Sequence, residues 1–288
     1  MDAIRVDNLT KRYGEHVAVD GISFAVSQGE AFGILGPNGA GKTTTLEMIE
    51  GLRRPNVGTI EVLGRPVWPD PRAVQARIGV QLQSTTLFDR LTARELLELF
   101  ARFYDRSDGV RRAQESLALV GLEAKAESYA EDMSGGQQQR LAIALALVHD
   151  PDVVFLDEPT TGLDPQARRN LWDVIRAIND RAGKTVVLTT HYLEEAEELC
   201  DRVAIMDESR VIALDTPEGL IASLGTDVRI SYRENGVDKV AYAADAQAAV
   251  LETLTAAKAN GTTIENLTVR GPSLEDVFLN LTGREFRE

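Results

Sequence analysis

The sequence predicts a mixed α/β protein, in which a layered domain with a largely parallel sheet is followed by a small α+β unit. Over residues 1–217, short strand-like runs alternate with helical patterns. The runs AFGILG, DVVFLDEP and KTVVLTTH are compact and apolar and are bounded by turn formers. Such runs are typical of strands that are buried on both faces of a parallel sheet. After Gly225 the pattern of strand-like and helical segments changes, which predicts a second unit.

Length and composition agree with this organisation. A chain of 288 residues, 43% apolar and 26% charged, suits a soluble domain of about 200 residues with a smaller appendage. The longest apolar run, Leu141–Val148, is far shorter than the stretch of about 18 residues that a transmembrane helix needs. The N-terminus has no apolar core of signal-peptide length. We therefore expect no membrane-crossing segment.

Charge and cysteine content narrow the class of partners. The net charge is −14 and no dense Lys/Arg stripe is visible, which argues against binding along a nucleic-acid backbone. Cys200 is the only cysteine, so no intrachain disulfide can form and a reducing compartment is expected. Its surroundings, EELCDRVAIM, predict a buried apolar residue and not a reactive thiol.

The predicted elements follow one another in a regular order. The strand AFGILG is followed by a glycine-rich loop, and residues 84–150 are mostly helical. Within that stretch, TARELLELFARFY repeats apolar residues at helical spacing, namely Leu96, Leu97, Leu99, Phe100 and Phe103. The sequence DTPEGL at 215–220 predicts a turn and a helix start. The second unit is predicted to contain strands at 228–234, 239–244 and 264–271 and helices at 246–261 and 273–283.

The glycine-rich loop predicts a phosphate-binding site. Residues 36–43, GPNGAGKT, fit G-x-x-x-x-G-K-[ST] at every fixed position, between a strand and a helix. Glycines allow successive backbone N–H groups to converge on one anion, and the following helix offers its amides and dipole to the same charge. Lys42 would reach the β- and γ-phosphates, and the Thr43 hydroxyl would bind Mg²⁺. The alternative is a glycine-rich turn with an exposed lysine.

A second segment, VVFLDEP, predicts two carboxylates near that loop. Asp157 ends an apolar strand, where its side chain would lie close to the Mg²⁺. If the strand stays extended at Glu158, the two side chains project differently, and Glu158 can face an attacking water. Metal binding and general-base catalysis would then be divided between neighbours. The alternative is a strand end followed by a solvated acidic turn.

The segment MSGGQQQR at 133–140 resembles the L-S-G-G-Q signature of the ATP-binding cassette (ABC) ATPases, with Met133 in place of leucine. Other family landmarks follow in order: an adenine-stacking aromatic at Tyr13, the Q-loop glutamine at Gln83, the D-loop at Asp164 and the switch histidine at His191. Taken alone, Tyr13 would be a half-buried surface residue and His191 a structural one. The resemblance covers residues 1–220.

This resemblance implies a fold, two cofactors and a set of site residues. The fold is a P-loop cassette at 1–220 with an antiparallel β portion and a helical subdomain at about 84–150, followed by an accessory domain at 226–288. Two cassettes would form a head-to-tail homodimer or heterodimer around two ATP molecules. Each ATP would be bound by Tyr13, Gly36, Asn38, Gly39, Gly41, Lys42, Thr43 and Thr44 of one chain and by Ser134, Gly135, Gly136 and Gln137 of the other. Thr43, Gln83 and Asp157 would bind Mg²⁺, and Glu158, His191 and Gln83 would be catalytic.

The tail, TPEGLIASLG and GPSLEDVFLNLTGREFRE, resembles the C-terminal extension of drug-resistance exporter ATPases of the daunorubicin type, whose partners are ABC-2 class permeases. The resemblance implies a subunit on the cytoplasmic face of the cell membrane that drives export of a drug or toxic metabolite. An exporter of lipid, polysaccharide or peptide is the main alternative. A non-transport cassette on ribosomes or DNA is disfavoured by the acidic charge. A GTPase or a kinase is disfavoured, because neither function requires the MSGGQ signature.

Overall fold

The computed structural model describes residues 1–82, 87–88, 90–104, 106–225 and 228–283. These residues form two compact units, which separate between Leu214 and Asp215. Sequence analysis predicted that the first domain ends at residue 220. The difference arises because a short helix, α8 (Pro217–Ala222), packs against α10 (Leu274–Thr282) of the second unit.

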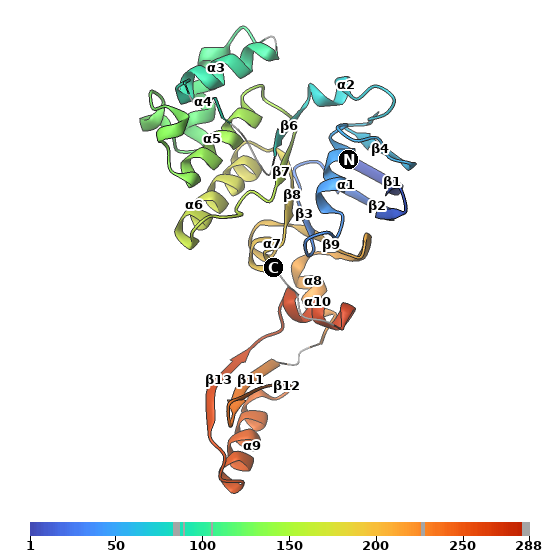
Figure 1. Ribbon diagram of the computed structural model, residues 1–288, viewed down its shortest axis with the longest axis vertical. Coiled ribbons are helices and arrows are strands. Elements are labelled where there is room, and N and C mark those ends of the chain that lie inside the picture. Colours follow the sequence, from blue (N-terminus) through green and yellow to red (C-terminus); the bar gives the residue numbers. More distant parts are fainter. Residues whose placement is uncertain (83–86, 89, 105, 226–227, 284–288) are drawn as a thin grey trace. The chain divides into compact units, whose positions relative to one another are not determined.

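A six-stranded sheet forms the centre of the first unit (Figure 1). Its strand order is β10-β9-β3-β8-β7-β6, and the four pairs from β9 to β6 are parallel. Every residue of β3, β7 and β8 is buried, which explains why these segments are uninterrupted apolar runs and confirms the predicted parallel sheet. The strands are β3 (Ala31–Leu35), β6 (Ile78–Gln81), β7 (Val153–Asp157), β8 (Thr185–Thr190), β9 (Arg202–Asp207) and β10 (Arg210–Asp215).

Three longer helices and one short helix accompany this sheet. Helix α1 (Lys42–Ile49) begins directly at the glycine-rich loop and contacts β7 and β8. Helix α6 (Pro165–Arg176) starts at Asp164, which caps its first amides, and continues into a π-helical turn (Ala177–Arg181). Helix α7 (Leu193–Leu199) contacts β3 and β8. Helix α2 (Arg72–Gln75) precedes β6 and contacts it.

A four-stranded antiparallel sheet, in the order β2-β1-β4-β5, completes the core of the first unit. Its inner side chains join those of β3 in one hydrophobic cluster, in which the rings of Phe24 and Phe32 stack at 5.3 Å between centroids. This packing holds the sheet beside the glycine-rich loop. The strands are β1 (Asp2–Tyr13), β2 (His16–Ser27), β4 (Val57–Val62) and β5 (Arg65–Pro66).

The predicted helical stretch forms α3 (Ala93–Phe103), α4 (Gly109–Leu119), two 3-10 turns (Glu123–Lys125 and Ala130–Asp132) and α5 (Gly135–Leu147). Helix α3 begins at a capping box of Thr92 and Glu95. Leu96 and Leu97 are buried as the helical spacing predicts. Phe103 is instead 66% exposed, because it lies in the last turn of α3, beyond the buried stripe.

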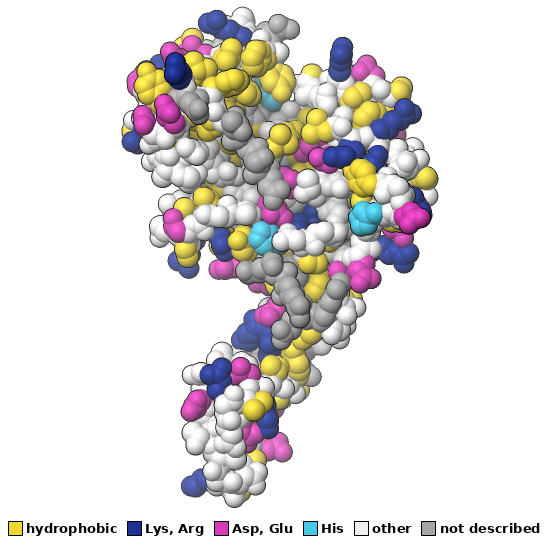
Figure 2. All heavy atoms as spheres, viewed as in Figure 1, with side chains coloured by type: hydrophobic (Ala, Val, Ile, Leu, Met, Phe, Trp, Pro, Cys, Tyr) yellow, Lys and Arg dark blue, Asp and Glu magenta, His cyan; other side chains and the backbone are white. Residues whose placement is uncertain are grey.

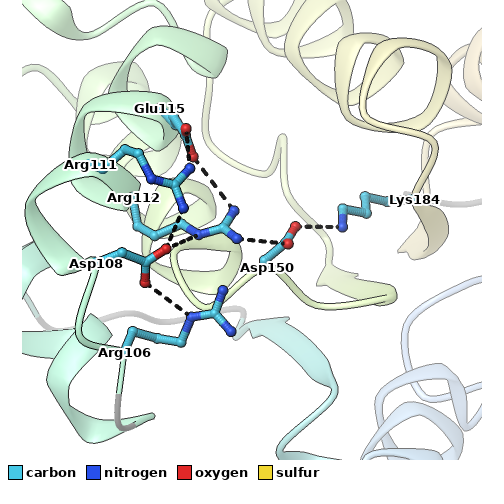
Figure 3. A network of polar contacts seen from close by, with 7 residues as sticks. All are labelled: Arg106, Asp108, Arg111, Arg112, Glu115, Asp150 and Lys184. Carbon is cyan, nitrogen blue, oxygen red and sulfur yellow. Dashed lines mark hydrogen bonds and ion pairs between the residues drawn. The ribbon is translucent and has the colours of Figure 1, made fainter.

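A chain of ion pairs connects this helical part with the parallel sheet (Figure 3). Asp150, in the turn between α5 and β7, accepts from Arg112 of α4 at 3.0 Å and from Lys184, next to β8, at 2.7 Å. Arg112 also reaches Asp108, at the start of α4, at 3.2 Å. Asp150 therefore joins segments that lie far apart in the sequence.

The second unit is a small α+β fold, as predicted. Its sheet has the order β12-β11-β13 with antiparallel pairs, and α9 contacts β11 and β13. Ile230 and Ala257 are buried between sheet and helix. The elements after α8 are β11 (Val228–Glu234), β12 (Val237–Ala243), α9 (Ala246–Ala259), β13 (Ile264–Arg270) and α10.

Charged side chains of both signs share the surface of the described residues. On the face drawn in Figure 2, Lys and Arg side chains lie singly or in small groups among acidic ones. Among the described residues, no helix combines the length and apolar character needed to span a membrane.

Candidate functional site

The glycine-rich loop lies between β3 and α1, and its glycines are required by its backbone. Gly39 and Gly41 have φ angles of 83° and 100°, which side-chain-bearing residues rarely adopt. A Cβ at Gly41 would lie 2.3 Å from the Ala18 carbonyl oxygen, and one at Gly36 would lie 2.3 Å from that of Met206. The loop therefore packs directly against neighbouring backbone, and the amides of the first turn of α1 have no side-chain cap. This is the geometry of an anion-binding loop.

Lys42 is buried at the start of α1 and points back into the loop. Its Nζ donates to the carbonyl oxygens of Gly36 at 2.8 Å and Pro37 at 3.2 Å, and it lies 3.3 Å from Glu158 Oε1. Burial lowers the pKa of Lys42, and the nearby Glu158 carboxylate opposes that shift. The ammonium is thus oriented by carbonyls and a carboxylate at the mouth of the loop.

Asp157 ends β7 beside Thr43. Its Oδ1 accepts from Thr43 Oγ1 at 3.3 Å and from Thr189 Oγ1 at 2.5 Å. Burial raises the pKa of Asp157, while the two hydroxyl donors lower it, and the net shift is upward. A hydroxyl and a carboxylate therefore lie side by side, and these are hard oxygen donors of the kind that Mg²⁺ prefers.

Glu158 has a different environment from Asp157, although the two are adjacent. The condition in the sequence analysis, that the strand stays extended at Glu158, is wrong: β7 ends at Asp157, and Glu158 has a φ angle of 47°. Its amide donates to Thr189 Oγ1 at 2.9 Å, which supports this turn. The side chain lies against Lys42 and has Oε2 3.2 Å from His191 Nδ1. The left-handed turn thus separates the two carboxylates.

The charges around Glu158 decide its ionisation. Burial alone raises the pKa of Glu158, but Lys42 and His191 outweigh burial and hold the pKa below its ordinary value. Glu158 is therefore an ionised carboxylate at neutral pH, next to a cation and an imidazole.

Lys42, Thr43 and Glu158 line a cavity of about 420 Å³, whereas Asp157 and His191 are not among its lining residues. Tyr13 lines the cavity together with residues of the glycine-rich loop. It is placed there by the β1–β2 hairpin, in which Tyr13 pairs with His16. Sequence analysis missed His16 and Ala18, whose only signal was their closeness to Tyr13 in the chain. The lining residues are Tyr13, His16, Ala18, Asn38, Gly39, Gly41, Lys42, Thr43, Thr44 and Glu158.

The signature segment lies at the start of α5 and does not line this cavity. Ser134 caps the helix by accepting from the Gln137 amide at 3.4 Å, and Gln137 Oε1 accepts from the Ser134 amide at 3.0 Å. Ser134 and Gly135 are exposed, while Gly136 lies close to Ala167 of α6. Within one chain, therefore, Ser134 to Gln137 present a helix N-terminus to a separate part of the surface.

Two further predicted residues have different outcomes. Gln83 lies outside the described residues. Asp164 accepts from the amides of Gln166 at 3.0 Å and Ala167 at 2.9 Å, so its carboxylate caps α6. Gln81, two residues before Gln83 in the chain, is buried in β6 and donates to the Leu82 carbonyl oxygen.

Comparison with known proteins identifies relatives along almost the whole chain. Residues 19–161 match the family model described as ABC transporter. The Nod factor export ATP-binding protein I of Paraburkholderia xenovorans (strain LB400) is 43% identical and is covered over 99% of each chain. The protein of the same name from Burkholderia orbicola (strain AU 1054) is 44% identical, over 98% of this chain and 97% of the relative.

Solved structures resemble about three quarters of the chain. A dimeric, post-hydrolysis state of the ATP-binding cassette MJ0796 bound to ADP and Pi has a TM-score of 0.67 at 30% identity, over 74% of this chain and 98% of that one. The cbiO1 subunit of the cbiONQ ABC transporter complex from Clostridium perfringens has a TM-score of 0.70 at 28% identity, over 77% and 92%.

Proposed function

Because the chain belongs to the ABC transporter family, as an ATP-hydrolysing cassette, we propose that it is the ATPase subunit of an exporter whose membrane-spanning permease is a separate protein. One observation carries this proposal. The cavity collects Tyr13, Lys42 and Glu158, whereas the signature residues Ser134 to Gln137 lie elsewhere on the surface. This separation supports a head-to-tail dimer of such subunits, in which the two halves of each proposed nucleotide site come from different chains.

The cavity has the groups needed to bind ATP. The loop amides and Lys42 would contact the β- and γ-phosphates, and Tyr13 would offer a ring on which adenine can stack. Thr43 and Asp157 fit Mg²⁺, since their oxygens lie 3.3 Å apart, and Gln83 is proposed as a further ligand. When bound, Mg²⁺ neutralises charge that develops on the phosphates.

Glu158 is the proposed group that orients the attacking water and accepts its proton. The carboxylate is ionised and is held by Lys42 and His191, so its oxygens have a defined direction. His191 would contact the γ-phosphate and stabilise charge in the transition state. Burial of both side chains limits competition from bulk water.

The second chain would complete the phosphate cage. The signature segment forms the N-terminus of α5, with Ser134 Oγ and the amides of Gly135, Gly136 and Gln137. The N-terminus of a helix favours a bound phosphate. Two copies placed head to tail would enclose two ATP molecules, and hydrolysis would reopen the dimer. The dimeric state of the MJ0796 relative supports this arrangement. A heterodimer with a related cassette satisfies the same geometry.

The proposed cargo is a drug or toxic metabolite, and a lipid, polysaccharide or peptide is the second candidate. Relatives named for Nod factor export, at 43% and 44% identity, support export and make a Nod factor a further candidate. In this assembly the chain binds the cytoplasmic face of the cell membrane through its permease. The cargo would contact the permease and not this subunit.

The test is to purify the tagged chain from gently solubilised native membranes and to identify what accompanies it by mass spectrometry. A polytopic membrane protein is expected, and it should be recovered equally with the hydrolysis-deficient Glu158→Gln chain. Recovery of ribosomal or DNA-repair proteins in place of a permease would show that the exporter assignment is wrong, while leaving the ATPase assignment intact.

A further inference from the structure

The ring of Tyr13 lies beside two cationic side chains. Tyr13 is 41% exposed at the end of β1 and lines the candidate nucleotide cavity. Arg53 Cζ lies 5.3 Å from the centre of its ring, and Lys11 Nζ lies 5.4 Å from it. Both distances fall within the range of about 6 Å over which a cation and an aromatic ring attract each other.

Arg53 is not a freely moving side chain. Its Nε and Nη2 donate to the two carboxylate oxygens of Glu47 at 2.5 Å and 3.2 Å, and its backbone amide donates to the Glu47 carbonyl at 3.0 Å. A two-point contact of this kind fixes the plane of the guanidinium. Lys11 is also held, because its Nζ donates to the Arg54 carbonyl oxygen at 2.6 Å.

Glu47 connects this arrangement to the phosphate loop. It lies in α1, the helix that begins at Lys42, so one rigid helix carries the phosphate-binding lysine and the carboxylate that holds Arg53. An exposed tyrosine at a hairpin turn would otherwise lose rotational freedom when a base stacks on it, which weakens binding. A ring that is already held in place avoids that loss.

We propose that Arg53, held by Glu47, is a positioning residue that orients the Tyr13 ring for stacking on the base of the bound nucleotide. This inference rests on the proposed role of Tyr13 in ATP binding. Arg53 acts through Tyr13 and not by attracting phosphate, so its contribution depends on the presence of the base.

The experiment compares a ligand with a base and one without it. Dissociation constants for ADP and for inorganic pyrophosphate are measured for the full chain and for Arg53→Ala, Glu47→Gln and Tyr13→Ala. Arg54→Ala is the matched control, because it removes an exposed positive charge from the next residue. Only the backbone carbonyl of Arg54 contacts Lys11, so this substitution keeps that hydrogen bond. Thermal unfolding confirms that each variant is folded.

Arg53→Ala is expected to weaken ADP about two- to fivefold and to leave pyrophosphate unchanged. Glu47→Gln should act in the same direction, Arg54→Ala should change neither ligand, and Tyr13→Ala should weaken ADP at least about fivefold. In the Tyr13→Ala background, Arg53→Ala should have no further effect. In steady-state hydrolysis by Arg53→Ala, the KM for ATP should rise while kcat stays constant.

Other outcomes overturn the inference in distinguishable ways. Equal weakening of ADP and pyrophosphate by Arg53→Ala would mean that Arg53 acts on the phosphates. An Arg53→Ala chain with unchanged ADP affinity, beside a weakened Tyr13→Ala chain, would remove Arg53 and keep the base platform. An unchanged Tyr13→Ala chain would contradict the proposed role of Tyr13 itself.

Discussion

Two adjacent residues of the same chemical type have different environments at the end of β7. Asp157 is bonded to two threonine hydroxyls, whereas Glu158 faces Lys42 and His191. The cause is a single left-handed residue, since Glu158 has a φ angle of 47° where β7 has ended. Backbone direction at one position therefore separates the proposed metal ligand, Asp157, from the proposed water-activating group, Glu158.

Replacement of Glu158 separates ATP binding from hydrolysis. Glu158→Gln keeps the volume and leaves the contacts of Lys42 with Gly36 and Pro37 in place, so ATP should still bind. Loss of the carboxylate should lower kcat about 10²- to 10⁴-fold. ATP should then hold the variant as a closed dimer, as seen by gel filtration in ATP and Mg²⁺. The exposed Glu194→Gln is the control, and a Glu158→Gln chain that stayed monomeric would contradict the dimer.

Glu50 is a buried carboxylate whose ionisation opposes folding. It is 2% exposed at the end of α1, and burial, together with Asp157 and Glu47, raises its pKa from 4.5 to about 8. Between pH 4.5 and about 8, Glu50 is protonated in the folded protein but ionised in the unfolded chain. The free energy of unfolding therefore falls as pH rises through this window, and Glu50 does not change it below pH 4.5.

Glu50→Gln should therefore stabilise the protein at high pH. The gain in the free energy of unfolding should be about 3 kcal/mol at pH 8–9 and near zero at pH 4.5. Urea unfolding of both chains in EDTA over this pH range measures the difference. A gain that does not depend on pH would show that improved packing, and not ionisation, is responsible.

At the scale of elements, α4 is linked through charges to the segments that flank β7 and β8 of the parallel sheet. Asp150 lies in the connection between α5 and β7, residues 148–152, and has a φ angle of 63°, a conformation that asparagine and aspartate tolerate better than most residues. This turn places its carboxylate between Arg112 and Lys184 (Figure 3).

Asp150→Asn tests the charge of this link while keeping the turn. The carboxylate is 41% exposed, so the loss in the free energy of unfolding should be about 1 kcal/mol at low ionic strength and smaller in 1 M salt. Urea unfolding at the two salt concentrations gives both values. Asp152→Asn, which removes the exposed pair with Arg77, is a control of similar charge outside the link. A loss independent of salt would indicate that the turn itself was disturbed.

At the scale of the whole molecule, the cavity at the glycine-rich loop and the signature segment at the start of α5 are separate parts of one chain. If two copies pair head to tail, each complete site takes Lys42 from one copy and Ser134 from the other. Two inactive variants with defects in different halves can then form one intact site when they are mixed, because an isologous dimer contains each contact twice.

Lys42→Ala and Ser134→Arg should each abolish hydrolysis alone and recover activity when unfolded and refolded together. Random pairing gives half mixed dimers with one good site each, so about one quarter of wild-type activity is expected if the sites act independently. ATPase assays of the mixture and of each variant alone measure it. Full activity of Ser134→Arg by itself would contradict the shared site.

The sequence by itself determined the phosphate loop, the signature helix and the parallel-sheet core. These features are local: the glycines of residues 36–41 are required by backbone conformation and close packing, and the Ser134 capping box is contained within four residues. Buried strands β3, β7 and β8 are uninterrupted apolar runs because both of their faces are covered.

Only the tertiary structure decided which side chains meet. Parallel pairing of β3, β8 and β7 brings their carboxyl ends to one edge, where Lys42, Glu158 and His191 converge from three separate segments. The turn at Glu158, the contact of Arg53 with Tyr13 and the assignment of α8 to the second unit had no sequence signal. Each depends on strand register and packing between distant residues, which local residue patterns do not encode.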